Sequence, residues 1–540
     1  MNTTRSAGIL LHPTSLPNSA GIGTLGASAY AFVDFLKKSR LSIWQVLPLG
    51  PTGYGDSPYQ SFSTFALNPL LIDLPQLAEK GWASDAEIQP PDYIKAAGPV
   101  DYGAVVYWKL PLLMTLARHF LTAVPEADRA SYAAFCEKNK YWLSDYALFM
   151  SIKTHYDAQA QEEAKTLGKA VAGTWNVYWE KSLAHHEKEA LAAWERDHQH
   201  DVEAYKVIQF FAYSQWLSLK KYANENGISI IGDIPIFVAS DSADVWANQH
   251  LFQLDKNLLP KAVAGVPPDY FSATGQLWGN PLYDWNRMRK DGYSWWISRI
   301  KQMLTLTDYV RIDHFRGFES YWAVPYGKKT AVYGEWQKGP RRSLFTEIRR
   351  TLGDLPLIAE DLGVITDGVR ALRDSCKLPG MKILQFAFEP KELQAGNLIN
   401  AFLPHTYSTS GTGANCVVYT GTHDNDTTQG WLSSLKAEQL SLVASYTQGR
   451  LLSEEEARAL LADGSLCKAL VRLAFASVAR LAIVPLQDVY ALDSSARMNT
   501  PSTSGANWSW RMESDMLSGD RAEKAAKALS ELSVLYGRAK

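Results

Sequence analysis

Eight short runs of apolar and β-branched residues recur along the chain, with stretches of helical character between them. They lie at 9–15, 43–49, 228–238, 308–315, 356–363, 381–389, 416–424 and 480–489. Apolar runs separated by helical segments are typical of parallel strands, which need a crossover segment before the next strand. Eight such units close into a TIM barrel. The sequence therefore predicts an α/β fold built on a TIM (β/α)8 barrel.

The spacing of the runs predicts how the domains are arranged. About 180 residues separate the second run from the third, which is far more than one βα unit needs. We therefore predict a barrel of residues 1–70 and 201–540 with long rim loops, and an inserted, mainly helical subdomain at 71–200. A Ser/Thr/Gly-rich loop at 494–507 and a Lys/Ala/Glu-rich helical tail follow the last run. No C-terminal β-sandwich domain is predicted.

The charge balance excludes some classes of partner. The 54 Lys and Arg residues face 56 Asp and Glu residues, which gives a net charge of −2. This balance offers no electrostatic basis for binding nucleic acid or an anionic membrane. The first residues contain no apolar stretch long enough for a signal peptide or a membrane span. We expect a cytoplasmic protein without nucleic-acid or membrane partners, and the sequence does not specify its oligomeric state.

The cysteines and the aromatic residues are also informative. The four cysteines are scattered and show no CxxC spacing. They predict neither a zinc site nor a disulfide framework, and we expect no metal and no cofactor. The 18 Trp and 26 Tyr would suit a sugar-binding protein, because aromatic rings cover the flat C–H faces of sugar rings. Filling a large core is the simpler explanation for any single Trp.

Three of the apolar runs end in acidic residues. They are YVRIDHFRGF at 309–318, LIAEDLGVI at 357–365 and YTGTHDNDT at 419–427. Parallel strands deliver such residues to the C-terminal rim of a barrel, where active sites of this fold lie. We expect Asp313, Glu360 and Asp424 to meet in one cleft. A cluster of carboxylates with an Arg and two His beside it points to chemistry at a glycosidic bond.

Each carboxylate suits a different role in that chemistry. Arg311 and Asp313 share one face of a strand, and the guanidinium is expected to lower the pKa of Asp313, as a nucleophile requires. Glu360 lies at a strand tip with apolar neighbours, which raises a carboxyl pKa and suits a general acid. Asp424 could stabilise a positively charged transition state. Taken singly, each motif also fits a structural ion pair or a helix cap.

These motifs resemble the conserved regions of the α-amylase superfamily: RxD on the fourth strand, Glu on the fifth and HD on the seventh. The chain most resembles the 4-alpha-glucanotransferase family, also called amylomaltase or disproportionating enzyme. Further family-like segments lie at 10–17, 53–69, 232–246, 265–285, 311–325 and 496–508. The string GVPPDYFSATGQLWGNPLYDW at 265–285 is the most specific of them. One departure is Pro-Ser-Thr-Ser at 501–504, where the family would have Pro-Gly.

The resemblance implies a retaining double displacement that moves a segment of an α-1,4-glucan to the 4-OH of an acceptor sugar, in starch or glycogen metabolism. The expected partners are α-1,4-glucans and maltooligosaccharides. The resemblance further implies Asp313 as nucleophile, Glu360 as acid/base and Asp424 as transition-state stabiliser. The sugar at the cleavage point and its neighbours would be bound by Tyr59, Asp233, Trp278, Asn280, Arg311, His314, His423 and Asn499.

Three other functions remain open from the sequence. An amylase-type α-1,4-glucan hydrolase would use the same residues with water as the acceptor. A metal-dependent barrel hydrolase would use Asp313, His314, His423 and Asp424 as ligands, although the first strand supplies only His12 toward such a site. A non-catalytic glucan-binding protein would leave the three carboxylates without a purpose.

Overall fold

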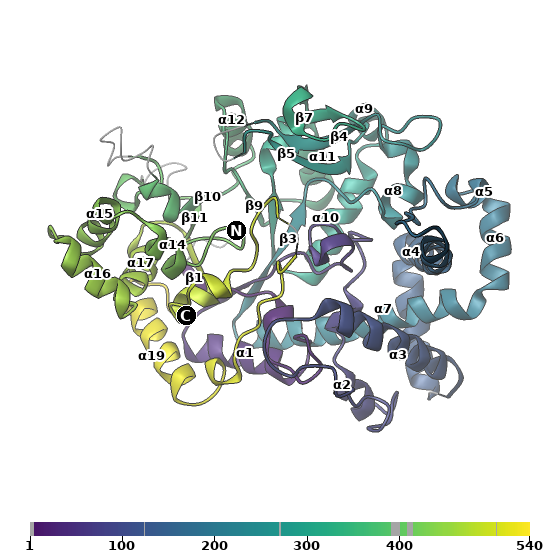
Figure 1. The fold of residues 1–540 in the computed structure, drawn as a ribbon, viewed down its shortest axis with the longest axis horizontal. Coiled ribbons are helices and arrows are strands. Elements are labelled where there is room, and N and C mark those ends of the chain that lie inside the picture. Colours follow the sequence, from purple (N-terminus) through teal and green to yellow (C-terminus); the bar gives the residue numbers. More distant parts are fainter. Residues whose placement is uncertain (1–4, 124, 269–271, 390–399, 408–413, 504) are drawn as a thin grey trace.

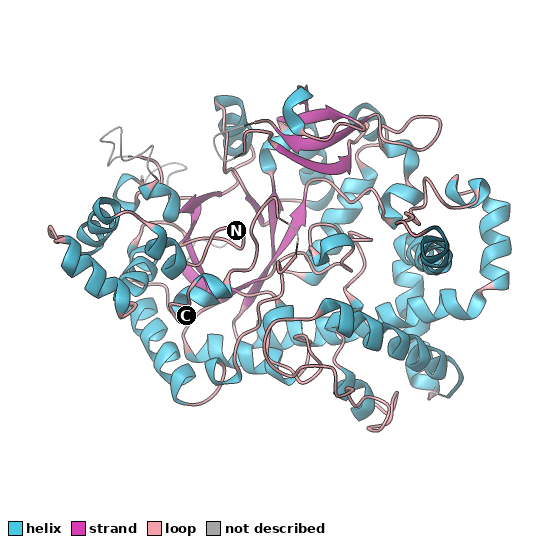
Figure 2. Cartoon of the chain, viewed as in Figure 1, coloured by secondary structure: helices cyan, strands magenta, loops and turns pink. Residues whose placement is uncertain are grey.

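The computed structural model describes residues 5–123, 125–268, 272–389, 400–407, 414–503 and 505–540. Eight parallel strands form its centre, in the order β10-β11-β12-β1-β2-β3-β6-β9 (Figures 1 and 2). Their bounds are β1 Ser6–Leu10, β2 Ile43–Gln45, β3 Ser229–Pro235, β6 Tyr309–Asp313, β9 Leu357–Ala359, β10 Gly380–Ile383, β11 Cys416–Tyr419 and β12 Leu481–Pro485. The backbone N–H of Ala359, on β9, donates to the carbonyl of Pro379, next to β10, at 2.9 Å. This bond joins the two ends of the sheet into a barrel.

The predicted TIM barrel is therefore confirmed, and each of the eight runs contains or adjoins a strand. The strands are shorter than the runs, because the chain bends into turns at the rim. The first strand also begins earlier than predicted, at Ser6, and His12 already caps a short 3-10 turn at Pro13–Ser15.

The alternation of side chains along the strands separates two cores. Ile43, Ile231, Ile358 and Ile383 fill the barrel interior with Tyr419, whose hydroxyl donates to Gln45 Oε1 at 2.8 Å. Neighbouring residues on the same strands point outward and pack against the helices. Each buried apolar side chain of this size contributes about 1.5–3 kcal/mol.

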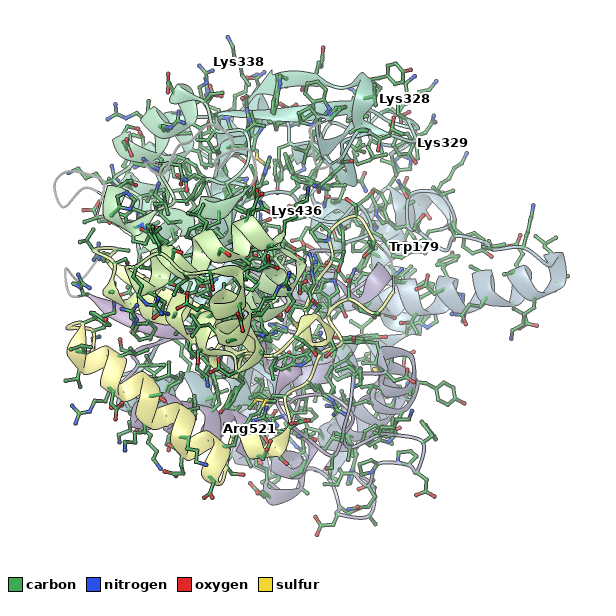
Figure 3. All side chains as sticks on the ribbon, turned by 60° about the vertical axis from the view of Figure 1, so that its left-hand side comes forward. Trp179, Lys328, Lys329, Lys338, Lys436 and Arg521 are labelled. Atoms are coloured by element: carbon green, nitrogen blue, oxygen red, sulfur yellow. The ribbon has the colours of Figure 1, made fainter. Side chains whose placement is uncertain are left out.

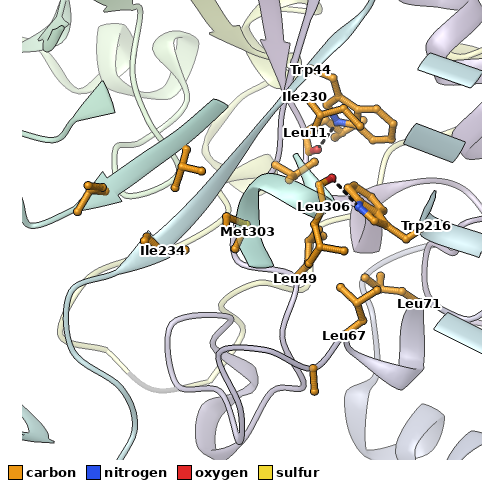
Figure 4. Packing of buried hydrophobic residues seen from close by; sticks show 14 of the residues in the cluster. Leu11, Trp44, Leu49, Leu67, Leu71, Trp216, Ile230, Ile234, Met303 and Leu306 are labelled. Carbon is orange, nitrogen blue, oxygen red and sulfur yellow. Dashed lines mark hydrogen bonds between the residues drawn. The ribbon is translucent and has the colours of Figure 1, made fainter. Parts of the chain in front are cut away.

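The outer core is fixed in register by indole hydrogen bonds (Figure 4). Trp44 Nε1 donates to the carbonyl of Leu11, and Trp216 Nε1 donates to the carbonyl of Leu306, both at 2.8 Å. Because both bonds are buried, they pin neighbouring elements to the barrel without leaving a polar group unsatisfied.

Helices surround the barrel and connect its strands. These are α1 Ala27–Lys38, α7 Gln199–Glu225, α10 Ser294–Leu306, α11 Arg342–Leu352, α12 Asp367–Ser375, α14 Thr428–Ser434, α15 Ala437–Gln448, α16 Glu454–Ala462, α17 Ser465–Ala476, α18 Leu486–Val489 and α19 Asp520–Leu535, together with two short helices, α8 Ala243–Ala247 and α9 Trp285–Lys290. The last of the barrel helices, α19, confirms the predicted helical tail. Among the described residues after β12 there is no further strand.

The region between β2 and β3 is largely helical, as expected for an insertion. It contains α2 Leu74–Glu79, α3 Tyr102–Ala123, α4 Glu126–Leu167, α5 Lys181–Ala184 and α6 Lys188–Asp197. Their apolar residues join the same continuous core as the barrel helices. The exact division at 71–200 stays a prediction. No helix in the described part of the chain is long and apolar enough to cross a membrane.

A second, antiparallel sheet was not predicted. Its strands, in the order β5-β4-β7-β8, are β4 Ala262–Val266, β5 Gln276–Pro281, β7 Ser320–Pro325 and β8 Glu335–Lys338. The sheet stands beyond the rim of the barrel, at the top of Figure 1. It grows out of the connections that follow β3 and β6, so it adds a wall next to the ends of those two strands.

The seam between β1 and β12 is secured by the C-terminal tail. Arg538 is fully buried, and its guanidinium donates to the backbone carbonyls of Ser6, Phe475, Ser477, Ala479 and Arg480. One side chain near the end of the chain thus holds the segment before β12 against the first strand.

Candidate active site

A buried ion-pair network lies at the C-terminal ends of β3 and β6. Arg311 donates to Asp233 Oδ2 at 2.5 Å and to Asp313 Oδ1 at 2.9 Å. The hydroxyl of Tyr59 donates to the same Asp233 oxygen at 2.7 Å. The side chains of Arg311 and Asp233 are 4% and 0% exposed, whereas that of Asp313 is 28% exposed. The network therefore holds Asp313 by one oxygen while the carboxylate faces the open rim.

Glu360 stands on the neighbouring strand end. Ile312 pairs with Ala359, so Asp313 and Glu360 follow each other in register. The Glu360 carboxylate accepts hydrogen bonds from the backbone N–H groups of His314, at 2.7 Å, and Leu362, at 2.9 Å. His314 adopts a left-handed φ of 51°, and its N–H is directed at Glu360. Backbone strain of this kind is typical of functional sites.

Asp424 lies on the loop after β11 and is held by the rim loop at 494–507. Asn499 Nδ2 donates to Asp424 Oδ1 at 2.6 Å, and His423 Nε2 lies 3.4 Å from Oδ2. Arg497 donates to the backbone carbonyl of Asp424 at 2.8 Å. The predicted rim loop, of which residue 504 lies outside the described residues, therefore contributes directly to this site.

Aromatic rings line the space between these groups. Tyr59 and His423 stack with ring centroids 5.1 Å apart, and Trp508 lies 5.8 Å from each. On the other side, the Trp278 ring meets the His314 ring edge-on at 4.8 Å. These contacts place flat ring surfaces around the carboxylates.

All eleven predicted residues thus lie in one connected group. Asn280 joins it through Gln60, the neighbour of Tyr59, whose Nε2 lies 3.5 Å from Asn280 Oδ1, while Asn280 Nδ2 donates to Val238 O at 2.8 Å. The sequence analysis missed Arg497 and Trp508. Arg497 lies in the rim loop and Trp508 directly follows it, and both belong to the family-like segment 496–508, which was the available signal for them. The role of each residue stays a prediction.

Burial and charge set the protonation states of the two central carboxyls. Burial raises the pKa of Glu360 to about 8, and the charge of Asp313 adds to this effect. Burial also raises the pKa of Asp313, to about 6, although the Arg311 charge opposes the change. Arg311 does lower the pKa of Asp313, as expected, but burial outweighs the guanidinium and the net shift is upward. As the pH falls, Glu360 therefore takes up a proton before Asp313 does.

The pKa values of Asp424 and His314 are shifted downward instead. Burial opposes ionisation of Asp424, but the charge of His423 and hydrogen bonds from His423 and Asn499 hold its pKa well below the usual range. Burial lowers the pKa of His314 to about 3, with a smaller contribution from Arg316, so its ring is neutral near pH 7. The site thus combines one permanent carboxylate with a pair that shares a proton.

The arrangement lacks the pattern of a metal centre. Among the described residues, no group of three or more His, Cys, Asp and Glu side chains is placed to hold a metal ion. A carboxylate on one strand end and a carboxylic acid on the next are instead the two groups that glycosidic-bond chemistry uses.

Comparison with known proteins agrees with this chemistry. The model of the family described as 4-alpha-glucanotransferase matches residues 11–517. The 4-alpha-glucanotransferase of Thermus thermophilus is 46% identical over 98% of this chain and 100% of its own length. That of Synechocystis sp. is 45% identical over 99% and 98%.

Solved structures show the same relationship. An amylomaltase from Streptococcus agalactiae in complex with acarbose superposes with a TM-score of 0.88, at 38% identity, over 99% of this chain and 100% of the other. An amylomaltase from Corynebacterium glutamicum, at 18% identity, shares the fold with a TM-score of 0.71, over 97% of this chain and 75% of that one. The matched span, the identity of the relatives and the barrel-rim site together establish that the chain belongs to the 4-alpha-glucanotransferase family of enzymes.

Proposed function

We propose that this enzyme moves a segment of an α-1,4-glucan or maltooligosaccharide to the 4-OH of an acceptor glucose or glucan, with retention at the anomeric carbon. The observation that carries the proposal is the pair Asp313 and Glu360. They follow each other on adjacent strand ends, and their pKa values favour a proton on Glu360 and a charge on Asp313. A double displacement requires these two states, because the nucleophile must be ionised and the general acid must carry a proton.

In the first step, an oxygen of Asp313 attacks the anomeric carbon and forms a glucosyl ester. The bond from that carbon to the glycosidic oxygen breaks, and Glu360 delivers its proton to the departing oxygen. Arg311 supports the nucleophile, because its hydrogen bond to Oδ1 orients the carboxylate and leaves Oδ2 available for attack.

In the second step, the 4-OH of the acceptor sugar attacks the anomeric carbon of the glucosyl ester, and the bond from that carbon to the Asp313 oxygen breaks. Glu360, now ionised, accepts the hydroxyl proton, and Asp313 leaves as a carboxylate. Both steps pass through a positively charged, oxocarbenium-like transition state. Asp424 stays ionised and stabilises that charge, since His423 and Asn499 fix its position.

The pH dependence follows from the directions of the two shifts. Asp313 must be ionised, so kcat/KM should rise with pH until its pKa, near 6, is passed. Glu360 must be protonated, so kcat/KM should fall once the pH exceeds its pKa, near 8. We expect a bell-shaped profile of kcat/KM with its maximum between these two pKa values. It is measured with maltotriose from the acid side of the first pKa to the alkaline side of the second. The two flanks report apparent constants of the pair. A profile that stays flat above pH 9 would rule out Glu360 as the acid.

Transfer and hydrolysis differ in the nucleophile that resolves the ester. Transfer is faster than hydrolysis only if the acceptor 4-OH is held in line with the anomeric carbon and water is poorly placed for attack. The rings of Tyr59 and Trp278, which are both partly exposed, can hold an acceptor glucose in this way.

With maltotriose as the only substrate, we expect a ladder of longer glucans together with glucose. Total reducing ends should stay nearly constant, because each transfer breaks one α-1,4 bond and makes another. Chromatography of the products and a reducing-end assay on the same samples measure both quantities. A steady rise in reducing ends without products longer than maltotriose would instead identify an amylase-type hydrolase.

The cytoplasm is the compartment that we propose for this activity. The free thiols of Cys136, Cys376 and Cys467 and the absence of a membrane-spanning helix among the described residues support it. Cell fractionation tests this proposal. Transferase activity found in the membrane fraction or in the medium, and not in the cytosolic fraction, would contradict it.

A further inference from the structure

The antiparallel sheet beside the active site presents an apolar row on one face. Leu277 pairs with Gly265, Gly265 with Trp322, and Trp322 with Trp336, so the row crosses all four strands. Residues opposite each other on paired strands point to the same face. Because Gly265 has no side chain, nothing projects from the sheet between Leu277 and Trp322. The opposite face carries Ala264, Tyr321 and Ala323, which are buried against the body of the protein.

The two ends of the row are open to solvent, with Leu277 36% exposed at one end, whereas Gly265 in the middle is buried. All 18 Trp lie within the described residues, and Trp336 is the only one that is exposed, at 42%. Its ring meets the Trp322 ring at 5.2 Å and 66°. The guanidinium of Arg316 covers one face of the Trp336 ring at 3.9 Å. These contacts hold the indole in a fixed position, so its exposure is not that of a loose surface side chain.

Tyr333 extends the row beyond the sheet. The turn before β8 is fastened to Trp322, whose Nε1 donates to the carbonyl of Ala331 at 2.8 Å. Gly334 packs so closely on the Trp322 indole that an added Cβ would lie 2.2 Å from Nε1. Tyr333 stands between these two points and is 69% exposed. We refer to the three rings of Trp322, Tyr333 and Trp336, together with the aliphatic side chain of Leu277, as the aromatic strip.

Hydrogen-bond donors border the strip. Lys328 lies over the Tyr333 ring, with Nζ 5.4 Å from its centroid. Lys338 ends strand β8, and Lys329 follows Lys328 in the turn. Figure 3 shows the three lysines directed into solvent at the outer margin of this part of the molecule. Flat apolar rings rimmed by donors suit a ligand that has C–H faces and hydroxyl edges.

The strip is continuous with the active site through the backbone. Trp278, whose ring contacts His314, directly follows Leu277 on β5. Arg316, which stacks on Trp336, comes two residues after His314 on the connection that follows β6. The strip and the active site are therefore built in part from the same two elements, β5 and the connection that follows β6.

We propose that the aromatic strip is a second binding surface for α-1,4-glucan, outside the catalytic cleft. It holds a remote part of a long chain and so favours long glucans over short ones. This rests on the proposed function, which supplies a glucan at the cleft. The occupant is a glucan rather than a protein, because a short row whose exposed rings are those of Tyr333 and Trp336, bordered by lysines, offers stacking positions instead of a broad apolar contact.

The test compares long and short ligands in an Asp313→Asn background, which removes turnover. The probes are soluble amylose and maltotriose, and binding is measured by calorimetry and by retardation in native gels that contain amylose. Trp336→Ala and Tyr333→Ala are each expected to weaken amylose binding roughly threefold to tenfold, as the loss of one aromatic stacking contact does. Maltotriose binding should not change. Trp336→Phe, which keeps a ring, should retain part of the effect.

Leu451→Ala serves as the control, because Leu451 is 93% exposed and lies on the loop between α15 and α16. It should bind both ligands like the parent. The strip proposal is overturned if Tyr333→Ala and Trp336→Ala bind amylose as the parent does, or if sedimentation shows that either variant breaks up an oligomer. Failure of the Asp313→Asn parent to bind maltotriose would overturn the proposed function itself, which separates the two results.

Discussion

Asp313→Asn is expected to reduce glucan transfer by roughly 10⁴-fold while leaving maltooligosaccharide binding intact. The amide has the shape of the carboxylate, and its oxygen can still accept the hydrogen bond that Arg311 donates. It cannot attack the anomeric carbon, so no glucosyl ester forms. Transfer from maltotriose measures the loss, and calorimetric titration with the same sugar measures binding.

Asp308→Asn is the matched control for this variant. Asp308 immediately precedes β6, at the end of the strand opposite Asp313, and accepts hydrogen bonds from Ile230 N and Asn224 Nδ2. The bottom of a barrel contributes to stability rather than catalysis. Asp308→Asn should therefore lower the melting temperature and keep kcat. If Asp313→Asn turned over maltotriose at close to the normal rate, the nucleophile would have to be another residue.

Glu360→Gln is expected to lower transfer from natural glucans by roughly 10³-fold. A glutamine cannot protonate the departing sugar oxygen. An α-glucosyl fluoride needs no such proton, so its reaction with Asp313 should continue, and the alkaline limb of the pH profile should disappear. Rates with maltotriose and with the fluoride, measured side by side, give the comparison.

Asp361→Asn tests whether any charge change at this strand end has the same effect. The Asp361 carboxylate accepts from Met381 N at 2.8 Å and pairs with Arg373, away from the cleft. We expect a less stable protein with nearly normal kcat. Equal losses with maltotriose and with the fluoride in Glu360→Gln would indicate a positioning role for Glu360 instead of proton transfer.

The barrel and the catalytic end of it could be predicted because both depend on short-range patterns. A parallel strand needs a continuous apolar run, and a rim residue must follow that run directly, so Asp313 and Glu360 could be placed from the sequence. The antiparallel sheet gave no such signal. Strands such as AVAGV and QLWGNP contain Gly or Pro, and their pairing depends on contacts between distant segments.

Other features of the site depend on burial, which a sequence does not report. The attraction between Arg311 and Asp313 was predictable from their spacing, but the desolvation that outweighs it arises from the surrounding fold. Trp508 meets Tyr59 and His423 only because three distant segments converge at the rim.

The seam that Arg538 fastens bears on how the protein is made. Strand β1 leaves the ribosome first, but its partner β12 follows about 475 residues later, since Ser6 pairs with Leu481. At translation speeds of roughly 5–20 residues per second this interval lasts about 25–95 s. During that time β1 has one unpaired edge, the kind of surface that templates aggregation. Nascent chains of this protein should therefore depend on chaperones until the last residues emerge, and slower synthesis would prolong the exposure rather than help the barrel to close.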